Sequence, residues 1–128
     1  MKNVSGCDAL LLPTGFRAAG LHAGIKRKKK DLALFVSDDP AAAAGTFTTN
    51  RVQGAPVRYC RRQLGASPRA RAIVVNSGIA NTCTGARGMR DAERMAAATA
   101  GALGADASEI LVCSTGRIGE PLPMDRIE

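Results

Sequence analysis

Three short apolar runs limit the folds open to this chain of 128 residues. They cover residues 31–37, 71–76 and 109–113, and their length and polar flanks are typical of strands buried in a sheet. Stretches with the spacing of amphipathic helices lie between them. The chain therefore predicts a mixture of helices and strands. By periodicity alone, the alternation from residue 41 onwards can be drawn as a doubly wound parallel sheet with two crossovers.

The boundaries of several elements can be predicted from turn and cap residues. One helix is expected to begin at Pro56, which suits a first helical turn, and to end before Gly65. A second helix is expected over residues 91–103, with Gly104 as its stop. Residues 38–40 predict a turn, so that residues 31–37 and 41–50 form a hairpin. Residues 1–14 are expected to be a lead-in segment, with a short strand at 9–12, and residues 15–128 to form the domain proper.

The composition predicts a thin hydrophobic core. Apolar residues make up 45% of the chain, but 23 of them are alanine; aromatic residues are only 3%, and tryptophan is absent. Large side chains carry most of the burial energy of a domain, and a chain of this size should bury roughly two-thirds of its unfolded surface. We therefore expect poor stability in isolation and a partner that completes the core.

Charge narrows the class of partner only in part. The net charge is +7, with 15 basic and 4 acidic residues before residue 91, and 3 basic and 7 acidic residues from there on. The basic part of the chain, before residue 91, could bind nucleic acid, an anionic membrane or an acidic small substrate. The basic run at 26–30 has no interleaved aromatic residue for base stacking, so a solvated turn is the alternative to a nucleic-acid site. Apolar runs are too short to span a bilayer, which favours a cytoplasmic protein.

Metal and histidine chemistry have little support in the sequence. Cys7, Cys60, Cys83 and Cys113 lack CxxC spacing, and His22 is the single histidine, so no zinc pattern is present and we expect buried or free thiols. A Ser-His-acid set would rest entirely on His22.

Two segments that follow predicted strands could carry chemistry. Residues 76–85 are small and polar, and their amide side chains could orient a ligand or merely cap the loop backbone. Their glycine spacing matches neither a dinucleotide fingerprint nor a P-loop. The second segment is Ser114-Thr115-Gly116, where the hydroxyl of Thr115 and the N–H of Gly116 could stabilise an oxyanion; an ordinary turn is the alternative.

Taken together, these segments resemble the bifunctional ornithine acetyltransferase / glutamate N-acetyltransferase family of arginine biosynthesis. The resemblance runs from about Gly15 to Ile127. The matching residues, in order, are Gly15-Phe16, Gly20, Gly24-Ile25-Lys26, Asp31-Leu32-Ala33-Leu34, Ser37, Pro40-Ala41, Ala44-Gly45-Thr46-Phe47-Thr48-Thr49-Asn50, Ala55-Pro56-Val57, Ala72-Ile73-Val74-Val75-Asn76-Ser77-Gly78, Ala80-Asn81, Cys83-Thr84-Gly85, Asp91-Ala92, Ser114-Thr115-Gly116, Ile118-Gly119 and Leu122-Pro123-Met124.

The resemblance implies an α+β fold and a transfer reaction. It implies the N-terminal part of a sandwich of two sheets between two helix layers, in place of the doubly wound sheet. The reaction would move acetyl from N-acetylornithine, or in bifunctional members from acetyl-CoA, to glutamate. Thr115 and Gly116 would form the oxyanion hole, and no bound cofactor or metal is implied. In the family a self-cleavage before a threonine frees the nucleophile, whose new amino terminus serves as the general base.

Some features depart from the family pattern. Ile79 stands where the family usually has Asn, and Arg117 replaces an apolar residue beside the oxyanion pair. The family's Met-Ala-Thr cleavage segment is absent from these residues, so no nucleophile is expected in this chain and its substrate-binding residues cannot be assigned. We expect it to be inactive alone and to need a C-terminal half or a separately encoded subunit. The alternatives are a non-catalytic interaction module and a basic nucleic-acid binder.

Overall fold

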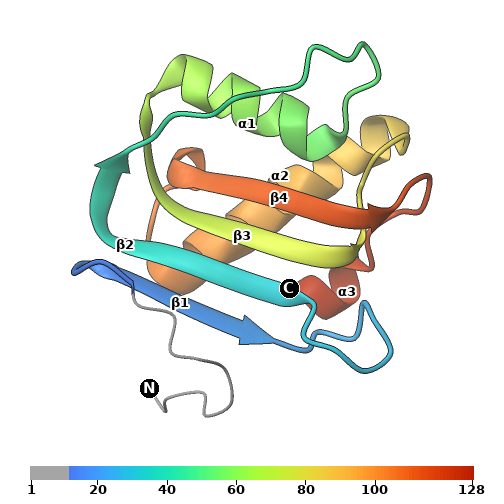
Figure 1. Cartoon of the computed structure of the whole chain (residues 1–128), viewed down its shortest axis with the longest axis horizontal. Coiled ribbons are helices and arrows are strands. Elements are labelled where there is room, and N and C mark those ends of the chain that lie inside the picture. Colours follow the sequence, from blue (N-terminus) through green and yellow to red (C-terminus); the bar gives the residue numbers. More distant parts are fainter. Residues whose placement is uncertain (1–11) are drawn as a thin grey trace.

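The computed structural model describes residues 12–128, and the strand expected at 9–12 lies almost wholly outside them. Within the described residues the elements follow one another as in Figure 1. They are β1 (Phe16–Leu21), β2 (Leu32–Ala42), α1 (Ala55–Ala66), β3 (Arg69–Ile79), α2 (Gly85–Leu103), a 3-10 turn η1 (Ala107–Glu109), β4 (Ile110–Arg117) and α3 (Met124–Ile127).

The strands form one mixed sheet in the order β1-β2-β3-β4. β1 pairs antiparallel with β2, β2 antiparallel with β3, and β3 parallel with β4. The parallel pair needs a crossover, which α2 supplies. The α+β class is thereby confirmed. A doubly wound parallel sheet is wrong for this chain, because among the described residues only one pairing is parallel.

The hairpin lies one strand earlier than the sequence predicts. It joins β1 to β2 through residues 22–31, and β1 escaped prediction because it contains no β-branched residue. The expected turn at 38–40 lies inside β2, where the pairing register with β3 shifts between Val36 and Ala41. Residues 43–50 are not a strand. Ala43 N–H donates to the carbonyl of Pro68, and after this residue the chain leaves the sheet. Phe47 packs on α1, and the Arg61 guanidinium lies 5.3 Å from the centre of its ring.

Both longer helices are confirmed, but each exceeds its predicted bounds: α1 continues through Gly65 to Ala66, where the sequence predicted a stop, and α2 is longer at its start. It begins at Gly85, six residues before the predicted start at Asp91. Its first turn is rich in glycine, a poor helix former. Tertiary contact compensates: Gly88 is buried so tightly against Thr84 and Asn81 that a β-carbon would overlap both. At the other end Gly104 takes a left-handed conformation (φ 61°) and donates to the carbonyl of Ala100, which closes the helix.

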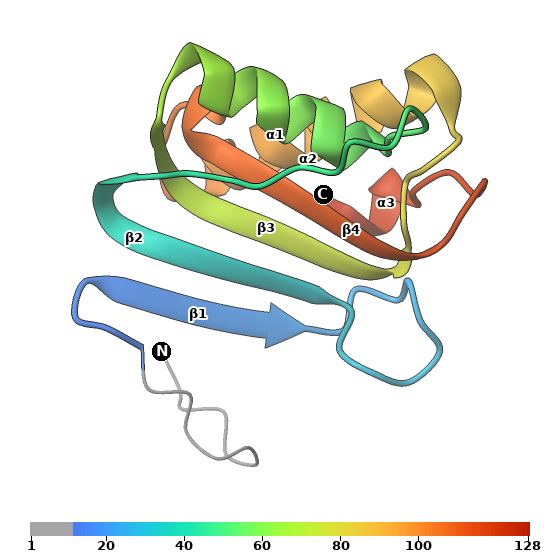
Figure 2. The same cartoon turned by 45° about the horizontal axis from the view of Figure 1, so that its top comes forward.

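The core lies between one face of the sheet and the helices (Figures 1 and 2). α1 and α2 contact each other and β4, and α2 also contacts β3. Met95, Ile110 and Val112 are essentially fully buried there. Several other core positions are alanines, which let the helices lie close to the sheet, as the composition predicts: Ala55, Ala70, Ala72, Ala92, Ala96 and Ala100.

The other face of the sheet carries large apolar side chains that remain exposed. Phe35 and Ile73 are cross-strand partners, with 39% and 37% of their surface exposed. Ala18 continues the same row on β1. No helix among residues 12–128 contacts this row closely enough to bury it. In the described part of the chain, no helix is long and apolar enough to cross a membrane.

Candidate functional site

The candidate oxyanion residues lie at the carboxyl end of the parallel β3–β4 pair. Thr115 pairs with Ser77, and Gly116 pairs with Gly78. The sequence placed Ser114-Thr115-Gly116 in a turn after a strand, and this was wrong, because β4 continues to Arg117. β4 is buried through Val112, whereas Thr115 and Gly116 are exposed. The hydroxyl and the amide are therefore presented on a rigid strand end that a ligand can reach.

A close contact between two glycines shapes this strand end. Gly78 has φ 113° and Gly116 has φ 129°, a region that other residues rarely occupy. A β-carbon at Gly116 would overlap the carbonyl group of Gly78. The backbone of Gly116 is thus fixed by direct contact with β3. Such fixation suits a donor that must hold its position while charge develops on a ligand oxygen.

Two buried amides hold the loop that follows β3. Asn76 Nδ2 donates to the carbonyl of Ile79 (2.9 Å), and Asn81 Nδ2 donates to that of Gly88 (2.8 Å). Asn81 itself has φ 49°, and its Oδ1 accepts from the Thr84 hydroxyl (2.8 Å). Of the two interpretations of this loop, the geometry favours capping of the protein's own backbone. Oδ1 of Asn76 has no partner among the described residues.

The same loop is tied to the end of β4. Ala80 N–H donates to the carbonyl of Arg117 (2.8 Å), and Gly119 N–H donates to that of Thr82 (2.8 Å). Ile79, where the family usually has Asn, is buried and belongs to the core cluster. Arg117, the other departure, is exposed and pairs with Glu120 at 2.8 Å. This ion pair turns the guanidinium toward the segment after β4.

A buried carboxylate organises the basic loop between β1 and β2. Asp31 accepts hydrogen bonds from the N–H groups of Ala23 (2.6 Å) and Lys26 (2.7 Å), and His22 Nδ1 lies 3.2 Å away. Burial alone would raise the pKa of Asp31, but these hydrogen bonds outweigh it, so that the pKa is lowered. The loop then packs on Gly78: a β-carbon there would meet Ile25 and Lys26 at 3.0 and 3.1 Å.

The remaining titratable candidates of the sequence are His22 and the cysteines, of which Cys113 lies on β4 two residues before Thr115. His22 is exposed and hydrogen-bonds only within its own loop in the described residues. Cys60, Cys83 and Cys113 are free thiols, and Cys7 lies outside the described part. Burial raises the pKa of Cys60 and of Cys113. Residues 12–128 contain no group of three or more metal-ligating side chains.

Sequence reasoning missed the two residues that support the strand end. Gly78 belongs to the small polar segment 76–85, but its contact with Gly116 depends on a parallel pairing that no local pattern reveals. Asp31 directly follows the basic run at 26–30, for which the sequence predicted either a solvated turn or a nucleic-acid site. Asp31 lies between the basic run and an apolar strand, and a carboxylate in such a position must be buried or capped. This pattern is the signal that could have identified Asp31.

The chain is similar in sequence to a known protein family and to several of its members. The model of the ArgJ family matches residues 17–128. A relative from Thermotoga neapolitana, the arginine biosynthesis bifunctional protein ArgJ, is 52% identical over 120 residues, which are 93% of this chain and 30% of the relative. The protein of the same name from Streptococcus thermophilus is 48% identical over 128 residues, all of this chain and 32% of the relative. The chain thus spans about a third of the length of the relatives it matches.

Two solved structures share the fold. The crystal structure of the arginine biosynthesis bifunctional protein ArgJ from Bacillus halodurans superimposes with a TM-score of 0.86 at 46% identity, covering 89% of this chain and 60% of that one. An ornithine acetyltransferase from Mycobacterium tuberculosis, solved in complex with ornithine, gives 0.85 at 47% identity, covering 90% and 63%. The likeness therefore extends over nearly all described residues.

Proposed function

Because this chain belongs to the ArgJ family, whose model matches residues 17–128, we propose that it carries the oxyanion-binding part of an acetyltransferase that moves acetyl from N-acetylornithine to glutamate. The observation that carries the proposal is the fixed, exposed end of β4, where Thr115 offers a hydroxyl and Gly116 a backbone N–H. Acyl transfer places negative charge on the carbonyl oxygen in its transition state. Donors that are already held in place stabilise that charge without reorganising.

The proposed chemistry assigns a limited role to this chain. A hydroxyl oxygen attacks the acetyl carbon of N-acetylornithine, the carbon–oxygen bond forms, and the carbonyl electron pair moves to its oxygen, where Thr115 and Gly116 would donate. Collapse breaks the carbon–nitrogen bond, and ornithine leaves as its amine takes the proton that the attacking hydroxyl gave up to the general base. Attack of glutamate's amine on the acetyl ester completes the transfer. Acetyl-CoA could supply the same acetyl group by loss of its thiol.

The nucleophile is proposed to come from polypeptide that corresponds to the uncovered part of the relatives. These relatives are about three times as long as the matched region, since it covers 30–32% of them. The exposed row that contains Phe35 and Ile73 supports such a partner, because burying a large apolar side chain contributes about 1.5–3 kcal/mol. We propose that a second sheet covers this face.

The proposal can be tested by reconstitution. The 128-residue chain is co-expressed with the remaining portion of the Thermotoga neapolitana relative, and acetyl transfer from N-acetylornithine to glutamate is measured. We expect transfer only when both parts are present. Thr115→Ala should lower kcat by about 100- to 1000-fold with little change in KM, because the hydroxyl acts mainly in the transition state.

Two variants make this result specific. Thr115→Ser keeps the hydroxyl and should retain most of the activity, whereas Ser114→Ala removes the neighbouring hydroxyl and should change kcat by less than about threefold. Unchanged kcat in Thr115→Ala would remove the oxyanion assignment. Turnover by the purified chain without the other part would contradict the proposed source of the nucleophile.

A further inference from the structure

Asp31 is held by main-chain hydrogen bonds beside the end of the β3–β4 pair. Its N–H donates to the carbonyl of Leu21 on β1 (2.9 Å), and its carbonyl accepts from the N–H of Ser77 on β3 (2.8 Å). Ser77 directly precedes Gly78 and is the pairing partner of Thr115. The backbone of Asp31 is therefore fixed next to the strands that carry the proposed oxyanion site.

The carboxylate of Asp31 is fully buried, and both of its oxygens accept from the basic loop. Oδ1 accepts from Ala23 N–H (2.6 Å), and Oδ2 accepts from Lys26 N–H (2.7 Å) and lies 3.2 Å from His22 Nδ1. An amide has one accepting oxygen, so an asparagine at this position would turn its own NH₂ group against one of these donors. A carboxylate can therefore hold both Ala23 and Lys26, whereas an amide can hold only one of them.

The part of the loop that the carboxylate holds packs on Gly78. The Cγ2 atom of the buried Ile25 lies 3.0 Å from the position that a β-carbon of Gly78 would occupy, and Cγ of Lys26 lies 3.1 Å from it. Gly78 in turn meets Gly116, where a β-carbon would overlap the carbonyl group of Gly78. Figure 2 shows the loop beside the end of β3. Because packed groups of this kind transmit displacements, a shift of the loop would reach Gly116.

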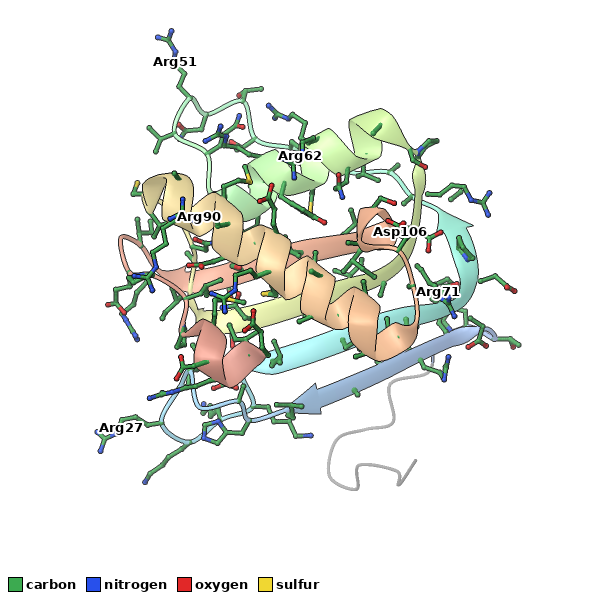
Figure 3. All side chains as sticks on the ribbon, turned by 180° about the vertical axis from the view of Figure 1, so that it is seen from behind. Arg27, Arg51, Arg62, Arg71, Arg90 and Asp106 are labelled. Atoms are coloured by element: carbon green, nitrogen blue, oxygen red, sulfur yellow. The ribbon has the colours of Figure 1, made fainter. Side chains whose placement is uncertain are left out.

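The same segment of the loop is also held from the side of α3. Arg126 Nη1 donates to the carbonyl of Gly24 (2.6 Å), and Cδ of Arg126 lies 3.7 Å from the β-carbon position of that glycine. Arg27, in contrast, points away from the sheet in Figure 3. Residues 23–26 are thus fixed by Asp31 and by α3, while the next part of the loop extends into solvent.

We propose that Asp31 is a positioning residue of the acetyl transfer, whose carboxylate sets the place of the Gly116 N–H through Ile25 and Gly78. The inference rests on the oxyanion assignment made in the proposed function. Since its carboxylate is fully buried, Asp31 acts only through these neighbours. The oxyanion charge develops in the transition state, so a misplaced donor weakens stabilisation of that state more than binding of the substrate. Loss of the carboxylate should therefore lower kcat and leave KM nearly unchanged.

The first test uses the complex of this chain with the remaining portion of the Thermotoga neapolitana relative, at a temperature where all variants stay folded. Asp31→Asn should lower kcat by about 10- to 100-fold and change KM by less than about twofold. Tyr59→Phe is the matched control, because it also removes a hydrogen bond of a buried side chain, from the Tyr59 hydroxyl to the carbonyl of Ala107 (3.0 Å). This bond lies at the other end of β4, beside Asp106 in Figure 3.

Tyr59→Phe should change kcat by less than about twofold. An unchanged kcat in Asp31→Asn, or equal losses of kcat in Asp31→Asn and Tyr59→Phe, would overturn the proposal. A rise in KM without a fall in kcat would also overturn it, because that result would indicate substrate binding in place of positioning.

Variants of Ile25 test the route from the loop to Gly78 and keep the carboxylate, so they remain informative if Asp31→Asn fails to fold. Ile25→Val retains the Cγ2 methyl group and should keep most of kcat, whereas Ile25→Ala removes it and should lower kcat about tenfold. Combining Asp31→Asn with Ile25→Ala should cost no more than the larger single loss, because both act on one route. Losses that multiply would contradict the route.

Amide NMR of the same complex, labelled selectively at glycine, gives a readout that needs no turnover. Asp31→Asn and Ile25→Ala should both shift the Gly116 signal. Tyr59→Phe should leave it in place, and an unmoved Gly116 signal in the first two variants would overturn the proposal. Failure of the proposed function is a separate result: unchanged kcat in Thr115→Ala removes the oxyanion assignment, whereas a loss in Thr115→Ala with none in Asp31→Asn removes only the positioning role.

Discussion

Gly116 approaches Gly78 so closely across the β3–β4 pair that a β-carbon at Gly116 would overlap the carbonyl group of Gly78. Both residues have positive φ, so the contact depends on glycine for conformation as well as for space. On its other side Gly78 is covered by Ile25 and Lys26 of the basic loop. Three segments that are distant in the sequence thereby fix one strand end.

Gly116→Ala is expected to lower the free energy of unfolding by about 3 kcal/mol, because the strained φ and the displaced backbone of Gly78 add together. Gly119→Ala is the matched control. Gly119 also has positive φ (83°), but no atom lies within 4 Å of its β-carbon position, so only the conformational cost of about 1 kcal/mol applies. Urea denaturation followed by circular dichroism measures both. Equal losses of unfolding free energy in Gly116→Ala and Gly119→Ala would show that the close contact between Gly116 and Gly78 does not affect stability.

Asp31→Asn is expected to lower the free energy of unfolding by about 1–3 kcal/mol at neutral pH, because the buried hydrogen bonds lose their charge. The pKa of Asp31 is lowered in the folded chain, so its stabilisation is present above the unfolded value of about 3.9 and is lost as pH falls through the folded value. The wild-type chain should lose stability on acidification below about pH 5, and the variant should lose less. Asp39→Asn, an exposed control, should follow the wild type. Parallel acid profiles for Asp31→Asn and the wild type would refute this.

Cys60 is expected to resist alkylation in the folded chain. Its thiol is buried, its Sγ lies 3.2 Å from the carbonyl of Val112, and burial raises its pKa, so the reactive thiolate is scarce. Cys83 is exposed and should react with iodoacetamide at least about tenfold faster. Mass spectrometry of peptides after timed alkylation measures both rates. In denaturant the two rates should become equal; comparable rates in the native chain would mean that α1 does not stay packed on β4.

The uncovered face of the sheet is expected to bind a hydrophobic dye. Phe35→Ser and Ile73→Ser should each reduce fluorescence of bound anilinonaphthalene sulfonate, because they remove exposed apolar surface from one row. Val52→Ser removes a side chain that is 64% exposed on a loop away from the sheet, and it should leave the signal unchanged. A chain that unfolds cooperatively and binds no dye would argue against a missing partner on this face.

Much of the fold could be predicted because local pattern and tertiary structure agree there. Residues 71–76 and 109–113 are β-branched runs that the sheet buries, and Pro56 and Gly104 mark helix ends as expected. Prediction failed where packing overrides local preference. The threonine-rich segment 43–50 has strand propensity but no strand to pair with, since Ala43 makes its last bond to Pro68.

The sequence indicates which residues form the candidate site, but it does not indicate their geometry. Family resemblance indicated Thr115 and Gly116, and small residues after an apolar run are visible in the sequence. Their support comes from Gly78, Ile25 and Asp31, which approach through pairing register and loop packing. Long-range register depends on the whole hydrophobic pattern of the sheet, so no single motif encodes it.

The crossover by α2 makes the β3–β4 pairing a long-range contact. β3 and β4 are neighbours in the sheet, but 30 residues separate Ile79 from Ile110, so a long loop has to close for the two strands to pair. A chain that has formed only the β1–β2 hairpin has no Gly116 beside Gly78. A partly folded chain that has not yet closed this crossover therefore lacks the Gly116–Gly78 contact that holds the proposed oxyanion donors in place.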